Sequence, residues 1–158
     1  MKFLVQRVAN ASVTVAGSLV GEIGRGLLVF VGCREGDASA DADYLLDKLL
    51  ALRIFEDAEQ RMNLSVQDIG GGVLTVSQFT LYADTRKGNR PGFSLAGDPE
   101  TAKALYDRIV GHLRSVLGTG RTASGIFGAD MAVALVNDGP VTIELCSDGK
   151  FPKHGNQL

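Results

Sequence analysis

The sequence contains three polar segments that could take part in chemistry. The first spans residues 77–84, where Ser77, Gln78 and Thr80 occupy positions at which a buried strand would normally carry aliphatic side chains. One interpretation is a strand end whose hydroxyls are satisfied locally. The other is a pocket wall, in which hydroxyls and backbone N–H groups, including that of Phe79, face a carbonyl substrate. From these residues alone, both interpretations remain open.

The second and third segments are equally ambiguous when each is taken by itself. Residues 137–142 read Asn-Asp-Gly-Pro-Val-Thr between two apolar runs, which predicts a turn. Residues 85–92 carry three cations, Arg86, Lys87 and Arg90, on a loop that contains glycine. Such cations commonly contact phosphate groups, but a solvated surface loop has the same composition.

The apolar pattern predicts one α+β domain that positions these segments. Strands are expected over residues 2–8, 12–15, 18–20, 26–32, 53–56, 73–79, 131–136 and 141–145, with a hairpin turn at 16–17. A first helix is expected from an acidic start at Asp37 to Leu52, and a second from Asp98 to Gly118, which suit its two caps. We therefore expect a mostly antiparallel, barrel-like sheet with two main helices.

The C-terminal stretch from Ser147 is polar and predicts a loose tail. We accordingly expect a domain over residues 1–147 and a polar tail over residues 148–158.

Composition narrows the class of protein. The chain has 158 residues, 45% of them hydrophobic and 22% charged, which is ordinary for a globular domain. No apolar run approaches the roughly 20 residues that span a bilayer, and the N-terminal stretch turns polar too early for a signal peptide, so we expect a cytoplasmic protein. A net charge of −2 argues against indiscriminate coating of nucleic acid.

The cysteines and histidines are too few and too scattered for familiar catalytic sets. Cys33 and Cys146 lie in or beside apolar runs and suggest reduced, buried thiols. With His112 on a predicted helix and His154 in the tail, neither a zinc site nor a Ser-His-Asp set is expected. We expect no cofactor.

Taken together, the three segments resemble the D-aminoacyl-tRNA deacylase family. The family's two signatures are a Ser-Gln-Phe-Thr strand end and an Asn-x-Gly-Pro-Val-Thr turn, and both are intact at residues 77–80 and 137–142. Shorter matches in the same order extend the resemblance to about Cys146, at residues 6–8, 24–28, 52–56, 62–65 and 127–131. The departures are Gly92, where many relatives carry serine, a variable loop at 121–125, and the tail.

The resemblance implies a proofreading hydrolase without a metal or cofactor. Its substrate would be the ester between a D-amino acid and the terminal ribose of tRNA. It also implies a homodimer in which a cis Gly139–Pro140 peptide enters the partner's pocket and captures the substrate's amino group. Arg7 and Met131 would hold or line this region. Because selection would exclude L side chains by collision, glycyl-tRNA should be accepted as well.

The sequence suggests how an ester could be cleaved without a protein base. An oxyanion hole alone can contribute about 2.7–4 kcal/mol, and the N–H groups of Phe79 and Thr80, within the 77–80 signature, are the candidates. A ribose 2′-hydroxyl of the substrate would then assist water. The rival mechanism uses Thr80 as a nucleophile but identifies no base. A non-catalytic RNA- or nucleotide-binding module and an unrelated threonine hydrolase remain as alternative functions.

Overall fold

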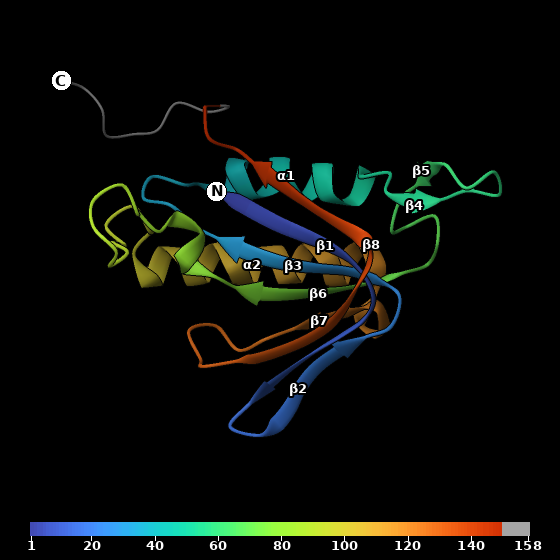
Figure 1. The fold of residues 1–158 in the computed structure, drawn as a ribbon, viewed down its shortest axis with the longest axis horizontal. Coiled ribbons are helices and arrows are strands. Elements are labelled where there is room, and N and C mark those ends of the chain that lie inside the picture. Colours follow the sequence, from blue (N-terminus) through green and yellow to red (C-terminus); the bar gives the residue numbers. More distant parts are fainter. Residues whose placement is uncertain (150–158) are drawn as a thin grey trace.

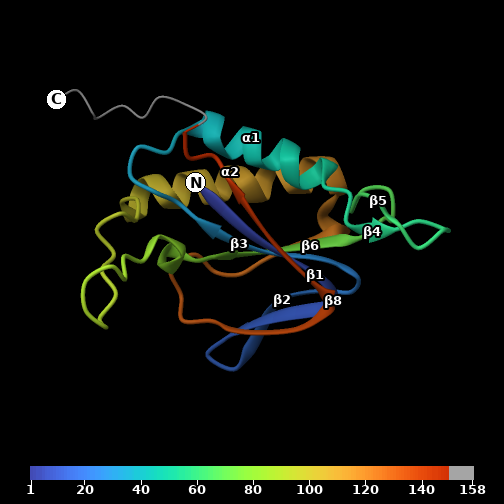
Figure 2. The same cartoon turned by 45° about the horizontal axis from the view of Figure 1, so that its top comes forward.

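The computed structural model describes residues 1–149, which form a mixed sheet with two helices on one face (Figures 1 and 2). In chain order the elements are β1 (Lys2–Val15), β2 (Ser18–Ile23), β3 (Gly26–Gly32), α1 (Ser39–Ala51), β4 (Phe55–Glu56), β5 (Met62–Leu64), β6 (Gly72–Ser77), the 3₁₀ helix η1 (Phe79–Tyr82), α2 (Pro99–Leu117), the 3₁₀ helix η2 (Thr119–Arg121), β7 (Thr122–Ser124) and β8 (Ala132–Cys146).

β1 is the central strand of the sheet. Its first half pairs with β3 and its second half with β2, while β8 runs antiparallel beside almost its whole length. Beyond β3, the strands β6 and β7 join in parallel. The two remaining edges approach each other, since a Cβ built on Gly21 of β2 would lie 3.1 Å from the carbonyl oxygen of Ser124 in β7. The sheet is therefore nearly closed, which confirms the predicted α+β, barrel-like class.

The two helices pack on the face that carries the larger core. β3 is buried along nearly its whole length, as its continuous apolar run predicts. Helix α2 begins as expected, because the Asp98 carboxylate accepts the N–H of Thr101 at 3.0 Å and Pro99 occupies the first helical position. It ends at Gly118, whose φ of 86° suits glycine. Helical spacing predicts a buried stripe of Ala42, Leu45, Leu46, Leu49 and Leu52. The first four are buried in α1, whereas Leu52 is the half-buried residue that follows the helix.

β8 is one long strand, whereas the sequence predicted two strands and a turn. The prediction of a turn at 137–142 is wrong because β1 pairs with β8 on both sides of this segment. The register shift between Gln6, which pairs with Thr142, and Val8, which pairs with Asn137, shows that β8 bulges here. Within the bulge the Gly139–Pro140 peptide bond is cis, as the resemblance implies, and Gly139 has a φ of +125°.

β6 ends at Ser77 and does not continue to Phe79 as predicted. The N–H of Gln78 still donates to the carbonyl of Val31 at 2.8 Å, but the chain then turns into η1. Leu81 closes that turn by donating its N–H to the carbonyl of Gln78 at 3.3 Å. The first signature therefore contains a strand end followed by a helical turn.

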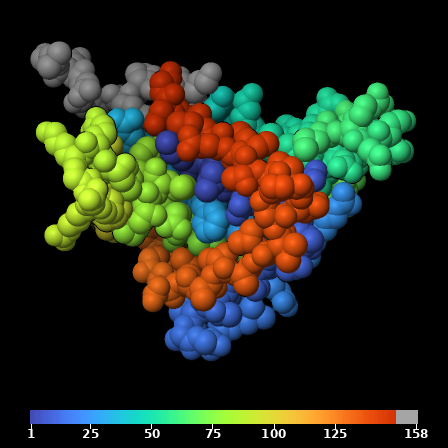
Figure 3. Space-filling view, viewed as in Figure 1, coloured from blue at the N-terminus to red at the C-terminus, as the bar shows by residue number. Residues whose placement is uncertain are grey.

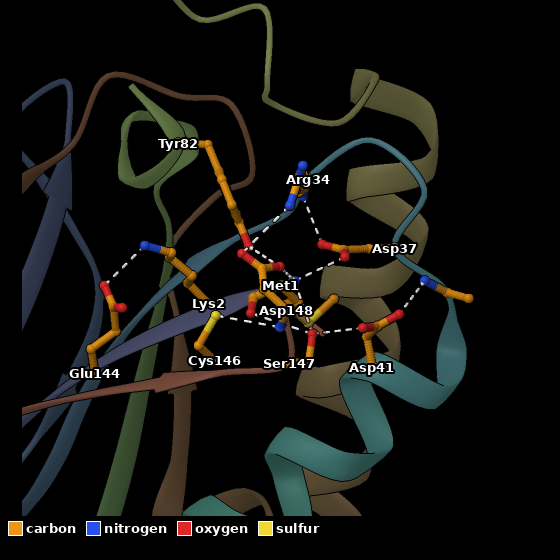
Figure 4. A network of polar contacts seen from close by, with 11 residues as sticks. Met1, Lys2, Arg34, Asp37, Asp41, Tyr82, Glu144, Cys146, Ser147 and Asp148 are labelled. Atoms are coloured by element: carbon orange, nitrogen blue, oxygen red, sulfur yellow. Dashed lines mark hydrogen bonds and ion pairs between the residues drawn. The ribbon is translucent and has the colours of Figure 1, made fainter. Parts of the chain in front are cut away.

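The α-ammonium group of Met1 lies at the centre of a buried polar network (Figure 4). It donates to Asp37 at 2.8 Å, to the hydroxyl of Ser147 at 2.9 Å and to Asp148 at 3.4 Å. Since Ser147 is fully buried, the prediction of a loose tail is wrong for this residue. Residues 150–158 of the predicted tail lie outside the described residues.

Candidate active site

The start of η1 presents two backbone donors. Gln78 and Leu81 use their N–H groups within the sheet and the helical turn, and Ala83 donates to the carbonyl of Thr80 at 3.0 Å. The N–H groups of Phe79 and Thr80 donate to no backbone carbonyl within residues 1–149. This follows from local geometry, because the first N–H groups of any helical turn have no preceding carbonyl to reach.

Side chains around η1 fix the orientation of this segment. The Gln78 side-chain amide donates a hydrogen bond to the hydroxyl oxygen of Thr80. The Ser77 hydroxyl oxygen accepts a long hydrogen bond, 3.5 Å, from the N–H of Gly128 in the connection between β7 and β8. Ser77 thus faces that connection, whereas Thr80 is exposed.

A cleft of about 470 Å³ opens beside η1. Of the predicted site residues, Ser77, Gln78, Phe79 and Met131 line it, while Thr80 does not. The lining residues come from β3, β6, η1, the first half of α2, the start of β8 and the loops next to these elements: Val31, Cys33, Val76, Ser77, Gln78, Phe79, Ala96, Gly97, Pro99, Ala102, Tyr106, Phe127, Gly128, Ala129, Asp130, Met131 and Val133. The wall is mainly apolar with a few polar groups, as is usual for small-ligand sites.

Three cleft residues of chemical interest were not predicted from the sequence: Tyr106, Phe127 and Asp130. Tyr106 forms part of the floor, where its hydroxyl donates to the Thr75 carbonyl at 2.9 Å and its ring packs 5.7 Å from that of Phe127. Asp130 also lines the cleft and is exposed. For the two in the β7–β8 connection a signal existed, since residues 127–131 belong to the matched stretches. Tyr106 gave none, because it falls within the apolar stripe of α2.

Two potentially ionisable groups of the cleft stay protonated at neutral pH. Burial, reinforced by the nearby Asp37 carboxylate, raises the pKa of the Cys33 thiol to about 12. Burial also raises the pKa of Tyr106 above its usual value. Neither residue is therefore an activated nucleophile or a base near pH 7.

The second signature is held by Arg7 of β1. The buried Arg7 guanidinium donates to the carbonyl of Asp138 at 3.1 Å and to that of Ile54 at 2.6 Å, and it forms an ion pair with the Asp138 carboxylate at 3.1 Å. A Cβ on Gly139 would lie 3.0 Å from Nη2 of Arg7 and 2.8 Å from Cγ2 of Val141. Only glycine fits at this position, both because of the space and because of its positive φ.

Asn137 closes the bulge from the other side. Its side-chain amide donates to the carbonyls of Arg7 and Val141, both at 3.0 Å. Gly139 and Pro140 are nevertheless exposed, and neither they nor Arg7 line the cleft of their own chain. Arg7 thus holds the Gly139–Pro140 segment, whereas Met131 lies with the first signature.

The three predicted cations lie on a hairpin next to the cleft. Asp84 and Gly92 close it through backbone hydrogen bonds of 2.8 and 2.9 Å. Arg86 donates back to the Asp84 carboxylate at 2.7 and 2.8 Å, and these hydrogen bonds hold the pKa of Asp84 well below its usual range. Lys87 and Arg90 are exposed and form no ion pair in the part of the chain that the structure describes. In Figure 3 this yellow-green segment protrudes from one side of the molecule.

Further features of the described chain bear on the site. Among residues 1–149, no three side chains of His, Cys, Asp or Glu come together as metal ligands. Neither of the described α-helices combines the length and hydropathy needed to cross a bilayer.

The fold is a small α+β domain whose cleft lies beside two backbone N–H groups that have no backbone acceptor among residues 1–149. Its family is shown by sequence comparison: residues 4–146 match the model of the D-Tyr-tRNA(Tyr) deacylase family, and the chain belongs to that family. It is thus a hydrolase that acts on aminoacyl-tRNA, and the predicted family is confirmed.

Relatives match over nearly the full chain. The D-aminoacyl-tRNA deacylase of Anaeromyxobacter dehalogenans (strain 2CP-C) is 58% identical over 151 residues, covering 96% of this chain and 100% of the relative. That of Desulfitobacterium hafniense (strain Y51) is 53% identical over 152 residues with the same coverage. Among solved structures, the c-Myc DNA unwinding element binding protein is 43% identical with a TM-score of 0.87, covering 92% of this chain and 97% of its own.

Proposed function

We propose that this protein hydrolyses the ester of D-aminoacyl-tRNA to a free D-amino acid and tRNA, rejects L-aminoacyl-tRNA, and also deacylates glycyl-tRNA mischarged on tRNA(Ala). The observation that carries the catalytic part is the pair of unpaired N–H groups at Phe79 and Thr80, beside the cleft. Two adjacent donors suit the oxyanion that forms when water attacks an ester carbonyl, and such a donor contributes about 2.7–4 kcal/mol.

The attacking water is assisted by the ribose 2′-hydroxyl of the substrate. Support comes from the lack of a suitable protein group among the described residues of the cleft, since Cys33 and Tyr106 remain protonated. Against Thr80 as nucleophile stands its hydroxyl partner, the Gln78 amide, which donates a hydrogen bond and accepts no proton at neutral pH. Asp130 is the only carboxylate among the described lining residues, and its side chain is exposed to solvent rather than enclosed in the cleft.

Chiral selection requires a second subunit in this proposal. The Gly139–Pro140 segment is exposed and rigidly held by Arg7, so it is free to enter the cleft of a partner chain. There its carbonyls would hold the substrate's amino group, while an L side chain would collide with the backbone wall. Exposed apolar side chains on the same strand, such as Val136 at 53% exposure, support contact with a second copy.

The exposed cations of the hairpin bind the tRNA backbone, and the protein acts in the cytoplasm. Lys87 and Arg90 support the first statement because neither is neutralised within the described chain. Arg86 contributes less, since Asp84 already pairs with it.

The deciding experiment measures the release of amino acid from D-alanyl-, L-alanyl- and glycyl-tRNA side by side. We expect hydrolysis of the D-alanyl and glycyl esters and resistance of the L-alanyl ester, because only the last presents a methyl group to the wall. Ordinary pockets discriminate between substrates that differ by one methylene by about 1–3 kcal/mol. With a rigid wall, the rates for glycyl- and L-alanyl-tRNA should therefore differ by a factor of more than about 200. Glycyl-tRNA as resistant as L-alanyl-tRNA would contradict selection by exclusion, and tRNA binding without any release would favour a non-catalytic RNA-binding module.

A further inference from the structure

Two large aromatic side chains are exposed next to the cleft. Phe79 is 57% exposed and Phe93 is 40% exposed, although both are fully apolar. Their rings pack edge to face, with centroids 5.0 Å apart and an interplanar angle of 66°. The contact holds the two rings in a defined mutual orientation.

The pair extends outward from the cleft. Phe79 lines the cleft, whereas Phe93 does not. Phe93 directly follows Gly92, the residue that closes the hairpin with Asp84. A ligand group in contact with Phe93 would therefore lie outside the cleft, next to the part of the ligand that the cleft encloses.

The same hairpin supplies charge beside this aromatic surface. Lys87 and Arg90 are exposed on it and unpaired within residues 1–149. An exposed aromatic ring next to free cations fits a nucleotide, whose base has an aromatic face and whose phosphate is an anion. An apolar peptide would use the rings but leave the cations without partners.

We propose that Phe93, supported by Phe79, forms a stacking platform for an unpaired nucleobase that precedes the esterified terminal nucleoside of the substrate. This rests on the proposed function, because it assumes that the cleft holds the aminoacyl ester. The base stacks on the Phe93 ring, which Phe79 supports edge-on, while the hairpin cations contact its phosphate. Stacking requires no particular base, since every base has an aromatic face, so the platform serves tRNAs of different sequence.

The test compares a long and a short substrate. D-alanyl-tRNA reaches the platform, whereas the D-alanyl 2′(3′)-ester of adenosine ends inside the cleft. For Phe93→Ala we expect KM for the tRNA ester to rise about tenfold with kcat unchanged, and KM for the adenosine ester to stay within about twofold. Tenfold corresponds to about 1.4 kcal/mol, within the range of a single base–aromatic stack.

Two further variants separate stacking from simple packing. Phe93→Tyr keeps an aromatic face and should keep the KM of the unmodified protein. Phe93→Leu keeps apolar bulk and should behave like Phe93→Ala. Full rescue by leucine would overturn the proposal, because it would show that Phe93 acts by filling space against Phe79.

Other outcomes would also decide against the platform. If Phe93→Ala raised KM equally for both substrates, Phe93 would act by supporting η1. If the variant, measured without RNA, sedimented as a smaller species than the unmodified protein, Phe93 would act by contacting another copy of this chain. An active protein whose Phe93→Ala variant is unaffected on both substrates would overturn the platform alone. A protein inactive on both substrates would overturn the proposed function, and the platform with it.

Discussion

The two ends of η1 differ sharply although they belong to one turn of four residues. At its start, Phe79 is 57% exposed and its N–H donates to no backbone carbonyl in the described chain. At its end, Tyr82 is 5% exposed and its hydroxyl donates to Asp148 at 3.2 Å. The first end keeps its donors free for a ligand, and the second uses its donor inside the protein.

The buried end explains how the exposed end is held. Asp148 also pairs with the Met1 ammonium at 3.4 Å and with Arg34 at 3.7 Å (Figure 4). Burial, together with the Asp148 and Asp37 carboxylates, holds the pKa of Tyr82 well above its usual value, so its hydroxyl remains a donor. Donors that stabilise an oxyanion must be preorganised, and in the proposed mechanism the network around Tyr82 would provide this preorganisation.

The largest expected effect comes from the buried end. Asp37 and the Met1 ammonium are both fully buried in their ion pair. In Asp37→Asn the ammonium loses its closest counter-charge, and breaking a buried pair typically costs about 3–5 kcal/mol. For a chain of this length that corresponds to a drop in Tm of about 10 °C, and kcat of the protein that remains folded should fall as well if the network positions η1. Calorimetry and an activity assay at low temperature measure the two quantities.

The control for Asp37→Asn is Asp43→Asn. Asp43 forms an equally short ion pair with Arg108 at 2.8 Å, but both side chains are about half exposed. Exposed pairs contribute little to stability, so this variant should leave Tm nearly unchanged. Equal losses in the two variants would show that burial of the network is not what stabilises the protein.

The second prediction concerns the exposed end. Phe79→Pro removes the N–H that is proposed to bind the oxyanion. Proline should be tolerated here because Phe79 is the first residue of η1 and the preceding residue, Gln78, has an extended φ. Phe79→Ala removes the same ring but keeps the N–H. We expect kcat for D-alanyl-tRNA to be about 10²–10³ lower for the proline variant than for the alanine variant. Similar kcat values in the two would exclude the Phe79 N–H from catalysis.

Local signals predicted much of the molecule. The cap at Asp98, the glycine end at Gly118 and the buried run of β3 depend on neighbours in sequence, and each was found as expected. Ser77 and Gln78 of the first signature line the cleft, and their part in catalysis stays a prediction.

The features that could not be predicted from the sequence depend on packing between residues far apart in the chain. Asn-Asp-Gly-Pro suits a bulge as well as a turn, and only the pairing of β1 on both sides decides between them. Ser147 is polar in isolation but is buried because its hydroxyl meets the Met1 ammonium, 146 positions away. Tyr106 becomes a cleft residue only when α2 packs beside Phe127.

The third prediction tests the link between the two ends. Tyr82→Phe removes one hydrogen bond to a partly exposed carboxylate, which should cost about 1–2 kcal/mol of stability. If the bond also holds η1, kcat should fall about three- to tenfold, and Asp148→Asn should add little further loss in the double variant. Unchanged kcat with reduced stability would mean that the network stabilises the fold without positioning the donors.

The fourth prediction concerns the hairpin next to the exposed end. Lys87→Ala should weaken tRNA binding a few-fold and flatten its dependence on log salt concentration by about 0.7, the value for one phosphate contact on a single strand. Arg86→Ala should flatten it less, because Asp84 already neutralises that guanidinium. Discrimination between D- and L-alanyl-tRNA should stay unchanged in both. A loss of discrimination without a loss of binding would place the hairpin at the amino-acid pocket.

The smallest expected effect belongs to Cys33, which lies between the two regions. It lines the cleft, yet the network reaches it electrostatically, since burial and then Asp37 raise its pKa to about 12 while the Met1 ammonium opposes them. At pH 7–9 almost none of the thiol is ionised, and only the thiolate is an effective nucleophile. Iodoacetamide should therefore leave deacylation intact over hours in this pH range, although it rapidly alkylates free glutathione under the same conditions. Cys33→Ala should keep kcat and KM within about twofold, because the thiol makes only a weak contact of 3.9 Å with the Ala102 carbonyl. Rapid inactivation by iodoacetamide that is abolished in Cys33→Ala would contradict this prediction. It would show that the Cys33 thiol ionises more readily than its burial and the nearby Asp37 carboxylate indicate.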